Sequence, residues 1–84
     1  MHICLQFKTF DLMNIKQRFG EKVKLLRTKK GWSQEKLALE ADIDRTYLPG
    51  IEKGERNVSI TVVEKLAIAL GLEIKDFFEE EGKD

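Results

Sequence analysis

The amino-acid sequence predicts an all-α fold of five helices, and three observations support this prediction. Apolar residues recur at spacings of three and four along most of the chain, which is typical of helices that bury one face. Good N-cap residues and helix-ending glycines alternate between these stretches. The single proline among 84 residues also suits a mostly helical chain, and the length is that of one small domain.

The first predicted helix spans residues 15–30 and the second spans residues 33–41. Gly31 supplies the left-handed residue that ends the first helix. Ser33 is a good N-cap for the second, and Glu35 suits the positive end of its dipole. The apolar faces of the two helices carry Ile15, Phe19, Val23 and Leu26, and Leu37, Ala38 and Ala41.

A third helix is predicted from about Arg45 to Lys53. Asp44 can cap it and Gly54 ends it. Its apolar face carries Tyr47, Leu48 and Ile51.

The fourth predicted helix begins near Thr61 and stops at Gly71, and Ile74, Phe77 and Phe78 indicate a short fifth helix. All five helices are expected to share one small core. We expect these residues to be largely buried in it: Phe19, Val23, Leu26, Trp32, Leu37, Ala38, Ile43, Tyr47, Ile51, Val63, Leu66, Ala67 and Leu70.

The two ends of the chain differ from this helical domain, which we assign to residues 13–79. Ile3, Leu5 and Phe7 alternate with polar neighbours, a period of two that predicts a short strand in an N-terminal extension of residues 1–12. Met13, directly before the first helix, leaves open whether this extension belongs to the native protein. Residues 80–84 form an acidic tail.

Composition argues against several function classes. The one cysteine is Cys4 and the one histidine is His2. This pair supplies neither a metal-binding set nor a nucleophile with its base, so we expect no metal, no cofactor and no enzymatic activity. A lone cysteine suits a reducing cytoplasm. The sequence shows no signal-peptide pattern and no apolar run of about 18 residues, so no membrane association is expected.

The formal net charge is zero, but the charges are unevenly distributed. Residues 16–30 carry seven basic side chains and a single acid, whereas residues 73–84 carry six acids and two bases. A protein that binds phosphates needs a positive face rather than a positive total. On charge alone, however, a solvated helix face is the simpler interpretation.

Two short helices joined by a tight turn contain the string WSQEKLALEADIDRTYLPGIEKGERNVS. Over about residues 16–71 the chain resembles the Cro/repressor-like (XRE-type) helix-turn-helix family and, within it, the controller proteins of restriction–modification systems. This resemblance implies a DNA-binding transcription regulator that works as a homodimer on a pseudo-palindromic operator, at the nucleoid of a prokaryotic cytoplasm or encoded by a phage. It rests on Arg27, Gly31, Ser33, Gln34, Leu37, Ala38, Ala41, Ile43, Tyr47, Ile51, Glu52 and Gly54.

The resemblance also implies which residues touch DNA. Arg45 can hold a guanine through two hydrogen bonds, and Thr46 offers a hydroxyl and a methyl group to base edges. The family's base-reading positions correspond to Arg45, Thr46, Pro49 and Gly50. Phosphate contacts, which fix register rather than specify sequence, correspond to Ser33 and Gln34 and to Lys53, Arg56, Asn57 and Ser59.

Several positions of this motif bear on its specificity, its turn and its stability. Pro49 and Gly50 depart from the family pattern and offer no side-chain donor, so DNA shape is expected to supply part of the specificity. Asp42 stands where the family's turn usually has glycine, and Asp tolerates the left-handed region better than most residues. Arg27 and Glu52 match a family pair, so we expect a close, partly buried ion pair with a structural role.

A homodimer is expected through the C-terminal part of the chain. One motif reads only a few base pairs, whereas two motifs about 34 Å apart on one face of the duplex require a two-fold axis. The predicted interface comprises Leu72, Ile74, Phe77 and Phe78, and pairing of the N-terminal strands across the axis would extend it. The alternative is that Phe77 and Phe78 close the core of the monomer.

A competing hypothesis keeps the fold but changes the function. The chain would then be a protein-interaction module, such as an antitoxin or adaptor, with little action on DNA. Zero net charge and the Pro49–Gly50 pair keep this alternative open.

Overall fold

The computed structural model describes residues 14–78. Within this range the chain forms α2 (Ile15–Lys29), α3 (Gln34–Ala41), α4 (Tyr47–Glu52), α5 (Ile60–Leu70) and the short 3₁₀-helix η1 (Ile74–Phe77). The described part of the chain is therefore all-helical, with no strand in it. The strand predicted around Ile3, Leu5 and Phe7 and the acidic tail of residues 80–84 lie outside the described residues.

The prediction of five α-helices is wrong for the described residues, which contain four, because residues 74–77 form a single 3₁₀ turn. The backbone N–H of Glu73 donates to the Asp76 carboxylate at 2.9 Å and closes this turn. Three glutamates follow Phe78 in the sequence. Because negative charge at the C-terminal end of a helix is unfavourable, this sequence does not favour a longer helix.

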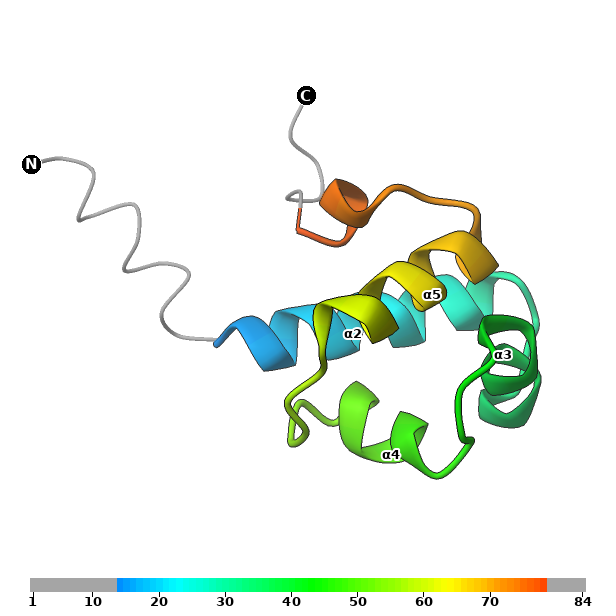
Figure 1. The fold of residues 1–84 in the computed structure, drawn as a ribbon, viewed down its shortest axis with the longest axis horizontal. Coiled ribbons are helices and arrows are strands. Elements are labelled where there is room, and N and C mark those ends of the chain that lie inside the picture. The colour runs from blue at the N-terminus through cyan, green and yellow to red at the C-terminus, as the bar shows by residue number, and fades with distance from the viewer. Residues whose placement is uncertain (1–13, 79–84) are drawn as a thin grey trace, which may run out of the picture.

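The helices pack in two pairs, α2 against α4 and α3 against α5, with η1 packed on α5 and α2. Figure 1 shows α4 along one edge of the molecule and η1 along the opposite edge. None of the described helices has the length and apolar content needed to cross a membrane. The arrangement leaves the outer side of α4 free of covering elements in this view.

Side-chain caps begin three of the helices. Asn14 Oδ1 accepts from the Gln17 backbone N–H at 2.9 Å, and Gln17 Oε1 accepts from the Asn14 N–H at 3.2 Å, a reciprocal capping box. Ser33 caps α3 as predicted, and Ser59 caps α5, which begins at Ile60. The local sequence therefore determines where these helices start.

α4 starts later than predicted, at Tyr47 instead of Arg45. Asp44 Oδ1 accepts from both the backbone N–H and the hydroxyl of Thr46 at 2.9 Å, which makes a tight turn ahead of the helix. Pro49 has no N–H to donate to the Arg45 carbonyl, and that carbonyl accepts from the Leu48 N–H at 3.2 Å instead. The proline therefore favours a tightened first turn.

Most of the predicted core is buried, with four differences. Tyr47 is 39% exposed, so its assignment to the core is wrong. Leu48, one position further along the same helix, is fully buried in its place. Leu26, Trp32 and Ile43 are half-buried and pack against the core from outside. The buried cluster comprises Phe19, Val23, Leu37, Ala38, Ala41, Leu48, Ile51, Val63, Leu66, Ala67, Leu70 and Phe77.

The backbones of α2 and α4 approach each other closely at Gly20 of α2. A Cβ atom placed on Gly20 would lie far inside van der Waals contact with the carbonyl oxygen of Ile51 in α4. The two backbones can therefore approach each other only because residue 20 has no side chain. This contact sets the position of α4 against the rest of the fold.

Candidate nucleic-acid interface

The turn between α3 and α4 is built around Asp42, which adopts the left-handed conformation with φ 61° and ψ 48°. Asp tolerates this region better than most residues, so the turn forms without glycine. The Ile43 N–H donates to the Ala38 carbonyl at 3.0 Å, and the Asp42 N–H donates to the Leu39 carbonyl at 3.2 Å. These bonds satisfy the last carbonyls of α3 and direct the chain into α4.

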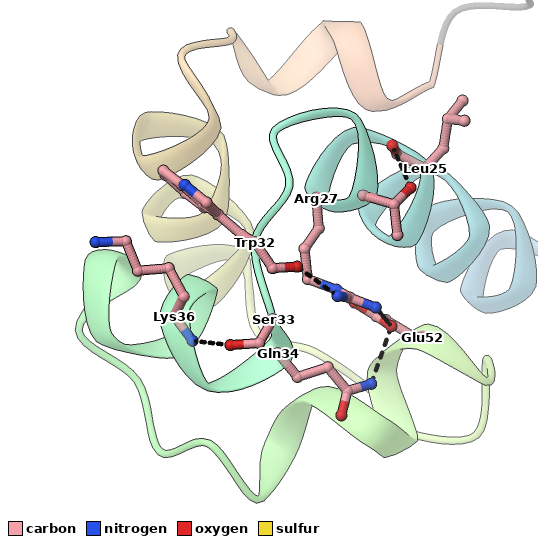
Figure 2. A network of polar contacts seen from close by, with 8 residues as sticks. Leu25, Arg27, Trp32, Ser33, Gln34, Lys36 and Glu52 are labelled. Carbon is pink, nitrogen blue, oxygen red and sulfur yellow. Dashed lines mark hydrogen bonds and ion pairs between the residues drawn. The ribbon is translucent and has the colours of Figure 1, made fainter.

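A partly buried network of polar contacts holds α2, α3 and α4 together. Glu52 is 8% exposed, and its carboxylate accepts from Arg27 Nε at 2.7 Å and from the Arg27 guanidinium Nη2 at 3.1 Å. The third guanidinium nitrogen of Arg27, Nη1, donates to the Trp32 carbonyl at 2.7 Å (Figure 2). The ion pair that the resemblance implies is therefore present, close and bidentate.

Gln34 belongs to the same network, which sequence reasoning missed. Its side-chain Nε2 donates to Glu52 at 3.0 Å, and Figure 2 shows its amide oxygen pointing away from Glu52. The amide nitrogen carries two hydrogens, and Glu52 accepts one of them. Glu52 thus ties the first residue of α3 to the last residue of α4. Gln34 and Glu52 lie 18 positions apart, so no local sequence pattern predicts their contact. The family resemblance is the signal that singles out Gln34.

The outer face of α4 and the turn before it present the predicted base-reading residues. Arg45, Thr46 and Pro49 are exposed and Gly50 is half-buried. The backbone N–H of Thr46, then its hydroxyl, and more weakly the charge of Arg45 hold the pKa of the Asp44 carboxyl below its usual value, because each favours the carboxylate. Asp44 therefore stays ionised and holds Thr46 in place at neutral pH.

Tyr47 and Arg56 form a contact on this face that sequence reasoning did not foresee. The Arg56 guanidinium carbon lies 4.7 Å from the centroid of the Tyr47 ring, a cation–π arrangement. An aromatic residue in the first turn of a short helix is usually a core residue. The sequence therefore predicted Tyr47 in the core and not in contact with Arg56. The exposed ring instead supports a positively charged side chain.

The other predicted phosphate contacts lie at two helix starts and in one loop. Ser33 Oγ accepts from the Lys36 N–H at 3.0 Å, and Ser59 Oγ accepts from the Val62 N–H at 3.2 Å. Each hydroxyl keeps its own hydrogen available as a donor. Lys53, Arg56 and Asn57 are exposed in the segment between α4 and α5.

The basic segment of α2 contributes less to an outer positive face than its composition indicates. Arg27 is bound to Glu52, and Arg18 donates to the Phe78 carbonyl at 3.3 Å. Lys30 also lies over the Trp32 ring, with its Nζ 5.1 Å from the ring centroid, so at least three of the seven basic side chains make contacts inside the molecule.

Phe77 is not available for the predicted dimer interface, since it is 2% exposed. Its ring packs edge-on against Phe19 with centroids 4.8 Å apart, and Phe78 stacks on Phe19 at 6.0 Å. The alternative that these rings close the monomer's own core therefore holds for Phe77. Leu72, Ile74 and Phe78 are half-buried and keep some exposed surface.

Comparisons with known proteins agree with this geometry. The helix-turn-helix family model matches residues 23–77. Control protein C.BamHI of Bacillus amyloliquefaciens is 49% identical over 67 residues, which cover 79% of this chain and 83% of that protein.

Two solved structures of controller proteins are also similar. The restriction–modification controller protein C.AhdI from Aeromonas hydrophila has 46% identity and a TM-score of 0.72, over 75% of this chain and 96% of that one. The controller protein C.Esp1396I, solved as a tetramer in complex with its natural 35 base-pair operator, has 35% identity and a TM-score of 0.69, over 75% of this chain and 83% of that one.

Proposed function

Because this chain belongs to the helix-turn-helix family, we propose that it is a sequence-specific DNA-binding regulator of transcription that acts as a homodimer on a pseudo-palindromic operator. The observation that carries the proposal is the exposed α4 face, held in a fixed relation to the start of α3 by Glu52. Residues 13–79 are the DNA-binding domain, and the nucleoid is where it acts. The similarity to controller proteins supports the same role here, within a restriction–modification system.

The DNA contacts divide between base edges and phosphates. α4 enters the major groove with its first turn leading, so Arg45 and Thr46 read bases. Pro49 and Gly50 permit close approach of the helix to the base pairs because neither carries a long side chain. At the start of α3, Ser33 and the second amide hydrogen of Gln34 bind one phosphate.

A second phosphate group is bound on the other side of α4. Lys53 is the C-cap of α4, and Asn57 and Ser59 follow in the loop and at the α5 cap. The two phosphate sites flank α4 and would set its depth in the groove. Arg56 lies on the same side, but its side chain turns back over α4.

The homodimer places the two α4 helices in successive major grooves. Its interface lies on the edge opposite α4, where η1 is found (Figure 1). Leu72, Ile74 and Phe78 contribute there, and Ile68 joins them because it is 70% exposed on the last turn of α5. The competing role as an antitoxin or adaptor is not favoured, since the similar proteins include controller proteins, one of them solved in complex with its operator.

A binding titration with two duplexes tests this function. Fluorescence anisotropy at one stated salt concentration would compare a 35 base-pair duplex from directly upstream of the protein's own gene with a shuffled duplex of equal composition. We expect the upstream duplex to bind at least about 10³-fold more tightly. Equal affinity for both duplexes would overturn the specific-regulator proposal and favour the protein-interaction module.

A further inference from the structure

Phe78, the residue after η1, is held by two consecutive residues of α2. Its ring stacks on Phe19 with the centroids 6.0 Å apart, and its carbonyl oxygen accepts from Arg18 Nη2 at 3.3 Å. Phe78 belongs to the proposed dimer surface together with Leu72 and Ile74. The side of α2 that carries Arg18 therefore helps to fix the position of that surface.

Lys22 continues this side of α2, because it follows Arg18 by four residues and lies one turn further along the helix. Both side chains are half-buried and both are engaged in contacts, whereas Lys24 is exposed. Partial burial is unusual for lysine, which is mostly exposed in proteins. The residues three and four positions away from Lys22 are apolar or basic, so an acidic partner must come from another part of the chain.

The sequence places three acids directly after this contact. Glu79, Glu80 and Glu81 follow Phe78 in the chain. The nitrogen of Glu79 is bonded to the Phe78 carbonyl carbon, whose oxygen accepts the hydrogen bond from Arg18. The Arg18 guanidinium therefore lies within the length of one side chain of Glu79.

The spacing of the acids matches the spacing of the two bases. Alternate residues of an extended chain are about 6.6 Å apart and point to the same side. Residues four apart on a helix are separated by about 6 Å along its axis. An extended segment that runs along α2 can therefore set Glu79 against Arg18 and Glu81 against Lys22, with Glu80 directed away from the helix.

We propose that residues 79–81 form a latch, in which Glu79 pairs with Arg18 and Glu81 pairs with Lys22, and which holds Phe78 and η1 against α2. The latch keeps the dimer surface in one arrangement, so less conformational entropy is lost when two copies associate. This last step rests on the proposed homodimer. The charge pairing itself is a property of the single chain and can be tested separately.

A charge swap in the full chain tests the pairing. Lys22→Glu should lower the midpoint of thermal unfolding by about 2–6 °C at low salt, because it sets like charges against each other. Adding Glu81→Lys should recover at least half of this loss, and NaCl at about 1 M should remove most of the difference. A double variant no more stable than Lys22→Glu would overturn the inference, whether the chain is a monomer or a dimer.

The three glutamates supply a matched control, since each change to glutamine removes the same charge. Glu79→Gln and Glu81→Gln should both lower the unfolding midpoint, whereas Glu80→Gln should shift it by less than about 1 °C. Equal shifts in all three variants would indicate a general effect of net charge and contradict the two defined pairs.

Sedimentation equilibrium relates the latch to the dimer. The double variant Glu79→Gln, Glu81→Gln should raise the dimer dissociation constant by about 3- to 10-fold at low salt, and Glu80→Gln should leave it unchanged. If the wild type is monomeric, the proposed homodimer fails while the charge swap still decides the pairing. If the wild type and the double variant dimerise equally well, the dimer stands and the role of the latch at its surface is wrong.

Discussion

Glu52 is a buried carboxylate that accepts three hydrogen bonds, two from Arg27 and one from Gln34. We expect Glu52→Gln to lower the free energy of unfolding by about 3–5 kcal/mol, because it leaves the Arg27 charge buried without its counter-charge. Urea unfolding monitored by circular dichroism would measure the loss. Lys36→Gln provides the control, since the Lys36–Glu40 pair is exposed and worth under about 1 kcal/mol.

A double-mutant cycle would show whether the pair itself is responsible. Arg27→Met and Glu52→Met combined should cost less than the sum of the two single changes, because the double variant leaves neither charge unpaired. Strict additivity would contradict a coupled ion pair.

Arg45 and Gln34 are expected to differ in what their loss does to DNA binding. Arg45→Ala should cost about 1–3 kcal/mol on the preferred operator and relax the choice at one base pair, because a bidentate base contact is lost. Gln34→Ala should weaken binding about equally on all sequences, and so should Lys53→Ala. Titration of each variant against single-base operator variants measures both effects. An Arg45→Ala protein that ranks the operators as the wild type does would argue against base reading by this side chain.

At the scale of elements, the crossing of α2 and α4 depends on one missing side chain. Gly20→Ala should destabilise the fold by about 1–3 kcal/mol, because its methyl group would overlap the Ile51 carbonyl of α4 and force the helices apart. Alanine is otherwise the better helix former by about 1 kcal/mol, so the intrinsic effect has the opposite sign.

Thermal unfolding of Gly20→Ala measures the net effect of the steric overlap and the higher helix propensity of alanine. Lys24→Ala, on the exposed side of the same helix, is the matched control and should change the stability little. A Gly20→Ala protein as stable as the wild type would mean that α4 can move away from α2 without cost.

At the scale of the whole molecule, the dimer can be tested with two equally exposed leucine-sized residues. Ile68 on α5 is 70% exposed and Leu39 on α3 is 73% exposed, so neither Ile68→Glu nor Leu39→Glu should unfold the monomer. Sedimentation at tens of micromolar protein should show a dimer for the wild type and Leu39→Glu, and a monomer for Ile68→Glu. Phe78 is a poorer probe because it also stacks on Phe19.

Two results would contradict the dimer surface. A wild type that stays monomeric would exclude dimerisation before DNA binding, and a dimeric Ile68→Glu would place the interface away from α5. Loss of the dimer should also weaken operator binding, since one motif alone contacts only half of the site.

The sequence by itself was sufficient to predict those features of the fold that depend on residues close to one another along the chain. Ser33 caps α3, Asp42 and Gly71 end helices in the left-handed conformation, and the apolar spacing locates α2, α3 and α5. Each of these rests on hydrogen bonds or faces formed within about one or two turns of helix, so the pattern is readable along the chain. The family resemblance added the ion pair between Arg27 and Glu52.

Packing between distant residues decided the rest. Whether Tyr47 or Leu48 faces the core depends on how α4 is rotated against α2, and Phe77 is buried because Phe19 offers it a surface 58 positions earlier. Gln34 meets Glu52 across 18 residues, and Arg56 turns back onto Tyr47 because Gly50 leaves room. Such contacts have no signature in local periodicity. They form only when the helices are assembled, because shape and burial then select which of several suitable side chains meet.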